Sequence, residues 1–334
     1  MIKTALLSKW HVHAQEYAEE AIQNEHITLT HVWDEQKERG KAWAEELGLT
    51  FEEEIDNIFS NPEIDAVIVA SPTSMHTEII NKAARNGKHI FTEKVLAETE
   101  VDAAAILQEV EKHGVKLMIS LPRLSADYYL YAQQVVDNGL LGRLTTIRCR
   151  LSHNGSVPTK QHPDGWLPKH FYDKELCGGG AFIDLGAHPI YLTNRLGGKA
   201  KAVTARFNQT YGHEVDDNAV VIVEYQSGAL GILETGFVST GSPFQLEVYG
   251  TEGTLMIEDG AIRIKSINLE DGWHSPSAAE LPTNAPSAMS QWVSEIKTGE
   301  KADITHHDAY LLTLINDVAR RSNEEGRRIE NKYT

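Results

Sequence analysis

The sequence predicts an α/β fold: a doubly wound parallel sheet, followed by an α+β region with a large, open, mostly antiparallel sheet. Two observations predict it. Up to residue 121, short apolar runs alternate with helical periodicity, and after residue 121 strand patterns follow one another with hairpin turns between them. A chain of 334 residues is long enough for two cores. We therefore expect one domain over residues 1–121 and a second over residues 122–334.

Buried strands and helices alternate in the first region. Apolar runs predict strands over residues 2–7, 27–33, 64–70, 89–92 and 116–121. Helical periodicity predicts helices over residues 13–23, 35–47, 75–86 and 101–113. Nearly continuous apolar strands separated by helices indicate a parallel sheet that is buried on both faces and joined by right-handed crossovers.

Polar residues follow these strands at their carboxyl ends, where open α/β sheets bind ligands. They are Ser8 to His11, Asp34, Ser71 to Thr73, Glu93 with Lys94, and Pro122 with Arg123. Asp34 follows the second strand, where a dinucleotide-binding unit places an acid that accepts hydrogen bonds from the ribose. Because an acid there disfavours a 2′-phosphate, Asp34 predicts NAD rather than NADP. Asp34 could also cap the helix beginning at Glu35, and the two roles are compatible.

The turn after the first strand lacks the glycines of a phosphate-binding G-x-G-x-x-G turn. Its sequence, SKWHVH over residues 8–13, still precedes a helix N-terminus whose N–H groups suit phosphate. Ser8 or Lys9 could assist, and we expect Trp10 and His11 close to cofactor or substrate. The alternative is a domain that has kept the fold and lost the dinucleotide. Two histidines two residues apart on a turn are an unusual metal site, and we expect no metal.

Hairpin-linked strands dominate the second region. Strands are predicted over residues 144–152, 202–209, 218–225, 229–238, 244–249, 253–258 and 261–266, and helices over residues 127–138, 287–298 and 304–326. A long loop over residues 154–176 is typical of a functional loop above a site. Consecutive hairpins predict a largely antiparallel sheet with one face free for a partner chain.

The segment CGGGAFIDLGAHPIYL, residues 177–192, carries the strongest chemical signal. Asp184 and His188 are four residues apart, so we expect them to share one face near the start of a helix. A carboxylate beside an imidazole can fix its tautomer and stabilise its cation, as a general acid/base requires. There are four alternatives: the glycines serve only close packing, Asp184 is a buried hydrogen-bond partner, His188 is a structural histidine of the helix, or the pair binds a metal. No third metal ligand is evident nearby.

Composition limits the function classes. Lys plus Arg number 31 and Asp plus Glu 48, so the net charge is −17 and lies along the whole chain. Such a surface repels phosphate backbones and anionic membranes, which excludes nucleic acid and membranes as expected partners. Two cysteines, Cys149 and Cys177, form no disulfide framework, and no apolar run suits a signal peptide or a membrane span. We expect a cytoplasmic protein.

Several motifs together resemble the Gfo/Idh/MocA oxidoreductases. FTEKVLA at residues 91–97 resembles the family's E-K-P signature, and GGGAFIDLGAH at residues 178–188 resembles its G-G-G-x-x-x-D-x-G-x-H signature. SPTSMH at residues 71–76, Asp217 with Asn218, and VYGTEGTL at residues 248–255 fit in the same order. The first turn departs from the family by lacking glycines, and Val95 stands where the family has proline.

The resemblance implies roles by position. Residues 1–121 would be an NAD(P)-binding Rossmann domain, and residues 122–334 a substrate-binding domain that also forms homodimers or homotetramers through its sheet. The implied catalytic residues are Lys94, Asp184 and His188. The implied cofactor contacts are Ser8, Trp10, His11, Val12, Asp34, Ser71, Pro72, Thr73, His76, Glu93 and Lys94.

We expect an NAD-dependent dehydrogenase or reductase of a sugar, inositol or related polyol. His188 would remove the hydroxyl proton, Asp184 would orient His188, and Lys94 would stabilise the alkoxide. Cationic and aromatic candidates for substrate contact are Arg123, Trp166, Lys169, His170 and Tyr172. The alternatives are a lyase or glycosidase that retains NAD as a redox catalyst, and a non-catalytic sugar- or NAD-binding sensor.

Overall fold

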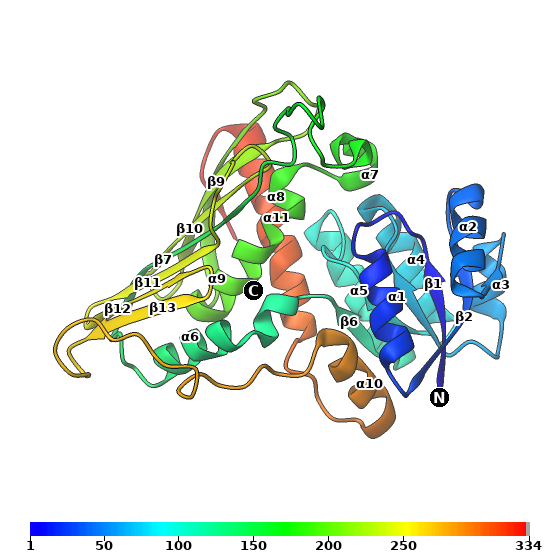
Figure 1. Cartoon of the computed structure of the whole chain (residues 1–334), viewed down its shortest axis with the longest axis horizontal. Coiled ribbons are helices and arrows are strands. Elements are labelled where there is room, and N and C mark those ends of the chain that lie inside the picture. Colours follow the sequence, from blue (N-terminus) through cyan, green and yellow to red (C-terminus); the bar gives the residue numbers. More distant parts are fainter. Residues whose placement is uncertain (332–334) are drawn as a thin grey trace. The chain divides into compact units, whose positions relative to one another are not determined.

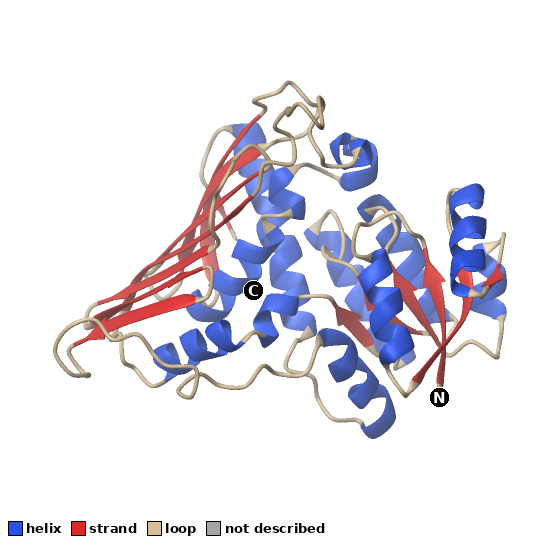
Figure 2. Cartoon of the chain, in the orientation of Figure 1, coloured by secondary structure: helices blue, strands red, loops and turns tan. Residues whose placement is uncertain are grey.

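A computed structural model describes residues 1–331, which form two compact units. The first unit contains Met1–Leu121 and Pro286–Thr313, and the second contains Pro122–Ala285 with the described residues from Leu314 onward. Figure 1 labels the elements, and Figure 2 separates helices from strands. The predicted α/β fold class is confirmed.

The first unit is built on a six-stranded sheet in the order β3-β2-β1-β4-β5-β6. All its strand pairs are parallel. The strands are β1 Ile2–Leu7, β2 Ile27–Trp33, β3 Thr50–Phe51, β4 Ala66–Val69, β5 His89–Thr92 and β6 Leu117–Ile119. The order reverses between β1 and β4, which makes the carboxyl ends of these strands the switch point at which such sheets bind ligands.

Helices cover this sheet. They are α1 Ala14–Gln23, α2 Lys37–Leu47, α3 Ile55–Ser60, α4 Thr73–Arg85, α5 Glu100–His113 and α10 Ala288–Thr298. Helices α1 and α2 contact β2, α4 contacts β4 and β5, and α10 contacts β5 and β6. All four residues of β4 are buried, as expected for a strand covered on both faces. The short elements β3 and α3 were not predicted.

Residues 286–313 pack with the first unit, although the sequence analysis placed them in the second domain. Trp292 of α10 is fully buried, its ring centroid lies 5.8 Å from that of Phe91 in β5, and its indole N–H donates to the carbonyl of Lys116. Local periodicity predicted the helix, but only this packing against β5 and β6 assigns it to a sheet. Helix α11, His306–Glu325, begins in the first unit and continues into the second.

The second unit contains an eight-stranded sheet in the order β13-β12-β11-β7-β10-β9-β8-β14. Its strands are β7 Leu144–Ser152, β8 Ala200–Asn208, β9 Asn218–Tyr225, β10 Leu230–Gly236, β11 Gln245–Gly250, β12 Gly253–Glu258, β13 Ala261–Ser266 and β14 Ile329–Glu330. Only the pair β7–β10 is parallel among these described strands.

One face of the second sheet carries the unit's helices. These elements are η1 Pro122–Ser125, α6 Asp127–Asp137, η2 Lys169–Tyr172, α7 Lys174–Cys177, α8 Ala181–Asp184 and α9 Ala187–Gly197. Helix α9 contacts β7 and β10, and α8 contacts β9 and β10. Burial alternates along β9 and β13, so alternate side chains face outward. Among the described residues, no helix combines the length and apolarity needed to cross a membrane.

Candidate functional site

The candidate site of the first unit includes an unusual turn directly after β1. Ser8 is buried and has a φ of 76°, in the left-handed region that glycine tolerates best. The Ser8 hydroxyl accepts hydrogen bonds from the backbone N–H of Trp10 at 3.0 Å and from Arg39 at 3.4 Å. The serine therefore supplies the conformation of a glycine and also ties the turn to α2.

Most backbone N–H groups of this turn donate to acceptors within the protein. The N–H of Lys9 donates to Asp34 at 2.8 Å, that of His11 to the Ala70 carbonyl at 3.0 Å, and that of His13 to Nδ1 of His11 at 3.2 Å. A glycine-rich turn would instead direct such groups at a pyrophosphate. Phosphate binding here would consequently depend on side chains and on the N-terminus of α1.

Asp34 follows β2 as predicted, and its carboxylate is completely buried. Oδ2 accepts from the backbone of Lys9 and from Nε of Arg39, both at 2.8 Å. Oδ1 accepts from the backbone of Gln36 and from Nη2 of Arg39, both at 2.7 Å. Asp34 thus holds the residue that precedes α2, and a ribose would have to displace Arg39 to reach it.

Glu93 and Lys94 follow β5 and are both buried. Oε2 of Glu93 accepts from the hydroxyl of Tyr17 and from Nδ1 of His13, the latter at 3.1 Å. Burial favours a raised pKa for Glu93, but the nearby His11, His13 and Lys94 hold this pKa well below its usual range. Burial lowers the pKa of His13, and the hydrogen bond and charge of Glu93 outweigh it, so that pKa is raised. The Lys94–Val95 peptide bond is cis.

The loop after β4 contributes further buried groups. Ser71, Pro72, Thr73 and His76 are all buried around the start of α4. The two ring nitrogens of His76 lie 2.8 Å from the carbonyl oxygen of Val95 and 3.2 Å from that of Ser71. Burial lowers the pKa of His76, which therefore favours the neutral ring. Of the predicted cofactor contacts, Val12 alone is well exposed, at 51%.

In the second unit, the glycine-rich segment forms two short helices rather than one. Asp184 is the last residue of α8, and His188 lies in the first turn of α9. Pro189 has no N–H to donate to Leu185, and the N–H of His188 bonds to the Leu185 carbonyl only three residues back, at 3.2 Å. The expectation of one continuous helix was wrong, because this proline interrupts the hydrogen-bond ladder.

Asp216 holds the start of this segment. Its carboxylate accepts from the backbone N–H of Gly180 at 3.0 Å and of Phe182 at 2.8 Å, and its carbonyl accepts from Ala181 at 2.8 Å. A Cβ atom at Gly180 would lie 1.9 Å from that carbonyl oxygen, so the close approach requires glycine. Burial raises the pKa of Asp216 from 3.8 to about 6, despite these hydrogen bonds.

His188 is buried and its Nδ1 lies 2.6 Å from the hydroxyl of Tyr191, one helical turn later. Orientation of His188 by Asp184 stays a prediction. The charge of Asp184 also acts on His153, whose pKa is lowered by burial against the opposing effect of Asp184. The His153 ring stacks on Phe237 with centroids 5.0 Å apart.

The loop over residues 154–176 is anchored next to this segment. Leu167 and Phe171 pack against Ala181 of α8 and against Phe237. Trp166 is 46% exposed, and its ring centroid lies 4.8 Å from that of His153. The loop is therefore fixed by its apolar residues and presents Trp166 at the surface of the unit.

The other predicted substrate contacts have separate environments. The hydroxyl of Tyr172 lies 2.7 Å from that of Ser156, and its ring stacks on His213. Lys169 is exposed and pairs with Asp164, and His170 is half-buried. Arg123 donates to the hydroxyl of Tyr128 at 3.1 Å and lies over the ring of Phe244. Their contact with substrate stays a prediction.

Sequence reasoning missed several residues that support the site: Tyr17, Arg39, His153, Tyr191 and Asp216. Tyr191 lies three residues after His188 and could have been found from helical spacing. Most contacts of the others join residues far apart in the sequence, for example Arg39 with Ser8 at 31 positions and Tyr17 with Glu93 at 76. No local pattern marks such pairs.

Comparisons with known proteins agree with these motifs. Residues 8–121 match the model of an oxidoreductase family with an NAD-binding Rossmann fold, and residues 129–256 match the GFO/IDH/MocA C-terminal domain. The chain belongs to the GFO/IDH/MocA family. The resemblance stated from the sequence is confirmed, and the first unit's sheet is the Rossmann fold of this oxidoreductase family.

The names of curated relatives of this chain state several different activities. The chain is 30% identical over 251 residues to scyllo-inositol 2-dehydrogenase (NAD(+)) of Bacillus subtilis, covering 72% of this chain and 68% of that protein. Myo-inositol 2-dehydrogenase of Thermotoga maritima is 24% identical, covering 82% of this chain and 81% of that protein. The 2,7-anhydro-N-acetylneuraminate hydratase of Escherichia coli is 28% identical, covering 72% of this chain and 64% of that protein.

Solved structures confirm the family's fold for this chain. GenD2 from gentamicin A biosynthesis, in complex with NAD, superposes with a TM-score of 0.83 at 23% identity, covering 99% of this chain and 97% of GenD2. A levoglucosan dehydrogenase, in complex with NADH and levoglucosan, gives a TM-score of 0.83 at 19% identity, covering 99% and 100%.

The support of the glycine-rich segment by Asp216 predicts a pH-dependent stability. A carboxyl group with a folded-state pKa of about 6 against 3.8 stabilises the fold fully below pH 3.8, and this contribution is lost as the pH rises through 6. The side chain of Asp216→Asn cannot ionise. In this variant the free energy of unfolding should therefore fall less between pH 4 and pH 7, by on the order of 3 kcal/mol. Urea unfolding from pH 4 to pH 7 measures it.

The control is Asp164→Asn, which removes the same charge from an exposed loop position. Parallel curves of unfolding free energy for the wild type and Asp216→Asn would contradict the prediction.

Proposed function

We propose that this protein is an NAD-dependent oxidoreductase acting on a secondary alcohol of a sugar, inositol or related polyol. Family membership carries the proposal, together with the presence of the family's lysine, aspartate and histidine at Lys94, Asp184 and His188. The names of the inositol dehydrogenases among its relatives support a polyol substrate.

The carboxyl edge of the first unit's sheet fits a dinucleotide. Oγ of Ser71 and Oε1 of Glu93 are buried polar atoms with no hydrogen-bond partner among the described residues. Both lie directly after a strand of the sheet, where a ligand would supply the missing partners. A bound nicotinamide would supply hydride transfer. The residues proposed to hold it are Ser8, Trp10, His11, Val12, Ser71, Pro72, Thr73, His76, Glu93 and Lys94.

NAD is the proposed form because two carboxylates, Asp34 and Glu35, follow the second strand and are paired with a single arginine, Arg39 of α2. A 2′-phosphate would face this net negative charge. Arg39 neutralises Asp34 and pairs with Glu35 at 2.5 Å, so Arg39 limits how well Asp34 can bind ribose hydroxyls.

The proposed base is His188. To accept a proton at Nε2, the neutral imidazole must carry its hydrogen on Nδ1, which then donates to the Tyr191 oxygen 2.6 Å away. Tyr191 is accordingly a positioning residue. Asp184 would add a negative charge that stabilises the imidazolium.

Lys94 is proposed to stabilise the alkoxide that forms when the hydroxyl loses its proton. An ammonium group with little access to water acts strongly on a developing charge. Arg123, Trp166, Lys169, His170 and Tyr172 are the proposed substrate contacts. Their aromatic and cationic groups suit a hydroxylated ring.

We also propose a cytoplasmic homodimer or homotetramer. Val220 and Ile222 of β9 and Leu230 of β10 are 42–44% exposed on the outward face of the second sheet. An apolar sheet face of this kind is covered in an assembly. The two cysteines, Cys149 and Cys177, are free and buried, which suits a reducing compartment.

The function is tested with a panel of sugars and polyols. NADH formation, followed at the absorbance band of the reduced cofactor, should occur with the wild type and fall by at least about 100-fold in Lys94→Ala and His188→Ala. Equilibrium NAD binding is measured in parallel on both variants.

Unchanged turnover in both variants would refute the catalytic assignment. Tight NAD binding with substrate consumption but no net NADH would favour a lyase or glycosidase that retains NAD, in line with the hydratase among the relatives. Absence of any NAD binding would favour a sensor.

Removal of the Tyr191 hydroxyl should lower kcat/KM by about tenfold in Tyr191→Phe, because the tautomer of His188 is no longer fixed. The acidic limb of the pH profile should move to lower pH, since the imidazolium loses an acceptor. Tyr225→Phe is the matched control, a buried tyrosine whose hydroxyl contacts Asn194. An identical effect of both substitutions would indicate a structural role only.

Arg39→Ala should strengthen NAD binding relative to NADP by about tenfold. The substitution frees both oxygens of Asp34 for the ribose hydroxyls and removes a cation that a 2′-phosphate could use. Dissociation constants of NAD and NADP measure the effect, and Lys41→Ala on the same helix is the control. A shift toward NADP would contradict it.

A further inference from the structure

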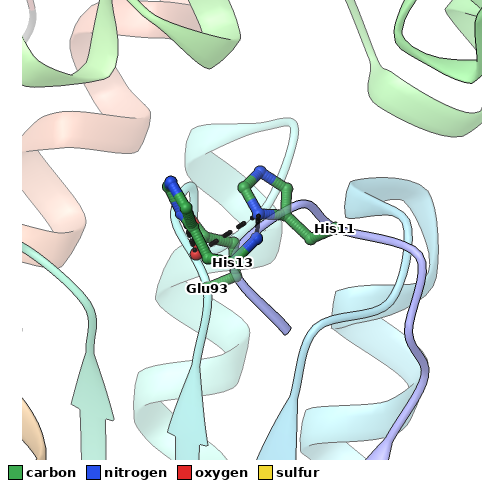
Figure 3. Close-up of side chains that lie close together, drawn as sticks. All are labelled: His11, His13 and Glu93. Carbon is green, nitrogen blue, oxygen red and sulfur yellow. Dashed lines mark hydrogen bonds and ion pairs between the residues drawn. The ribbon is translucent and has the colours of Figure 1, made fainter. Parts of the chain in front are cut away.

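Three side chains of the first unit meet at the carboxyl ends of β1 and β5 (Figure 3). His11 and His13 come from the turn after β1, and Glu93 follows β5. One potential ligand atom from each lies within 4.8 Å of the other two. Nδ1 of His13 is 3.1 Å and Nδ1 of His11 is 3.6 Å from the same carboxylate oxygen, Oε2 of Glu93.

Hydrogen bonds alone leave this cluster poorly matched. Nδ1 of His11 accepts a long hydrogen bond of 3.2 Å from the backbone N–H of His13, so this nitrogen carries no proton in that arrangement. The same nitrogen faces Oε2 of Glu93, which also carries only lone pairs. A proton on this nitrogen, or a metal ion between the two atoms, would make their contact attractive. The second oxygen of Glu93 is buried without a hydrogen-bond donor.

We propose that His11, His13 and Glu93 bind one divalent first-row transition metal ion of the zinc type. Two imidazole nitrogens and one carboxylate oxygen are a ligand set that such ions prefer. With metal–ligand bonds of about 2.1 Å at a tetrahedral centre, neighbouring ligand atoms lie about 3.4 Å apart. The separations of 3.1 and 3.6 Å bracket this value.

The surroundings of the cluster suit a metal site. The hydroxyl of Tyr17 donates to Oε2 of Glu93 and so orients the carboxylate, and the ion would replace the proton that Nδ1 of His13 shares with the same oxygen. The side chains of His11 and Glu93 are 5% and 2% exposed, whereas that of His13 is 32% exposed and provides an entry path. His76 is not a fourth ligand, because carbonyl oxygens face both of its ring nitrogens.

Three protein ligands leave a coordination position open for water or another oxygen ligand. The ion would also bring positive charge into the turn over residues 8–13, whose backbone donors are already engaged. The expectation that this turn holds no metal rested on the spacing of the two histidines. The third ligand comes from a residue 80 positions after His13, which that spacing could not reveal.

The test uses the untagged full-length protein after treatment with a chelator. Zn²⁺ is titrated by calorimetry, and Co²⁺ by its visible absorption. We expect one ion per chain and a Co²⁺ spectrum of a nitrogen- and oxygen-ligated centre. His11→Ala, His13→Ala and Glu93→Gln should each weaken Zn²⁺ binding at least about tenfold, and Tyr17→Phe should weaken it less.

His274→Ala is the matched control, since His274 also lies 3.1 Å from a glutamate oxygen but in an exposed pair without a third ligand. Far-UV circular dichroism verifies that each variant folds, and His13→Asn, at the most exposed ligand, replaces any variant that does not. Absence of saturable Zn²⁺ binding, or equal weakening in His274→Ala, overturns the proposal. Zn²⁺ binding is measured without NAD, so its failure is distinguishable from failure of the proposed dehydrogenase activity.

Discussion

A buried carboxylate at the end of β5 is the constraint on which the first unit's site depends. Glu93 stays ionised although its side chain is 2% exposed, and an isolated charge in such a place would be strongly unfavourable. Tyr17, His13, His11 and Lys94 surround it with donors and positive charge. The turn after β1, the helix α1 and the end of β5 are thereby held in one arrangement.

Buried carboxylates hold the other site segments in the same way. Asp34 accepts the N–H groups of Lys9 and Gln36, and Asp216 accepts those of Gly180 and Phe182. Asp217 accepts those of Thr210 and Tyr211. Irregular backbone leaves N–H groups without ladder partners, and a carboxylate can satisfy two of them at once. These acids therefore fix loop geometry, whatever else they bind.

The sequence predicted the strands of both sheets except the two-residue strands β3 and β14, and most of the helices, because hydrophobic periodicity is a local property. It also placed Lys94, Asp34 and Glu93 correctly at strand ends. It did not predict the break before His188, which depends on the missing N–H of Pro189, or the packing of Trp292 against Phe91. The partners of the site residues were mostly out of reach, since Arg39 on Ser8 and Tyr17 on Glu93 are pairings of tertiary structure.

The turn over residues 8–13 combines a glycine-like backbone conformation with imidazole side chains. A left-handed residue at Ser8 preserves the path that glycine would take, at a conformational cost of about 1 kcal/mol that the hydroxyl's two hydrogen bonds offset. Because most N–H groups of the turn have acceptors within the protein, the polarity that it presents comes largely from side chains. His11 and His13 supply that polarity; Glu93 holds the ring of His13, and the backbone N–H of His13 holds that of His11. A glycine-rich turn would present bare backbone to an anion at this position, whereas this turn presents imidazoles.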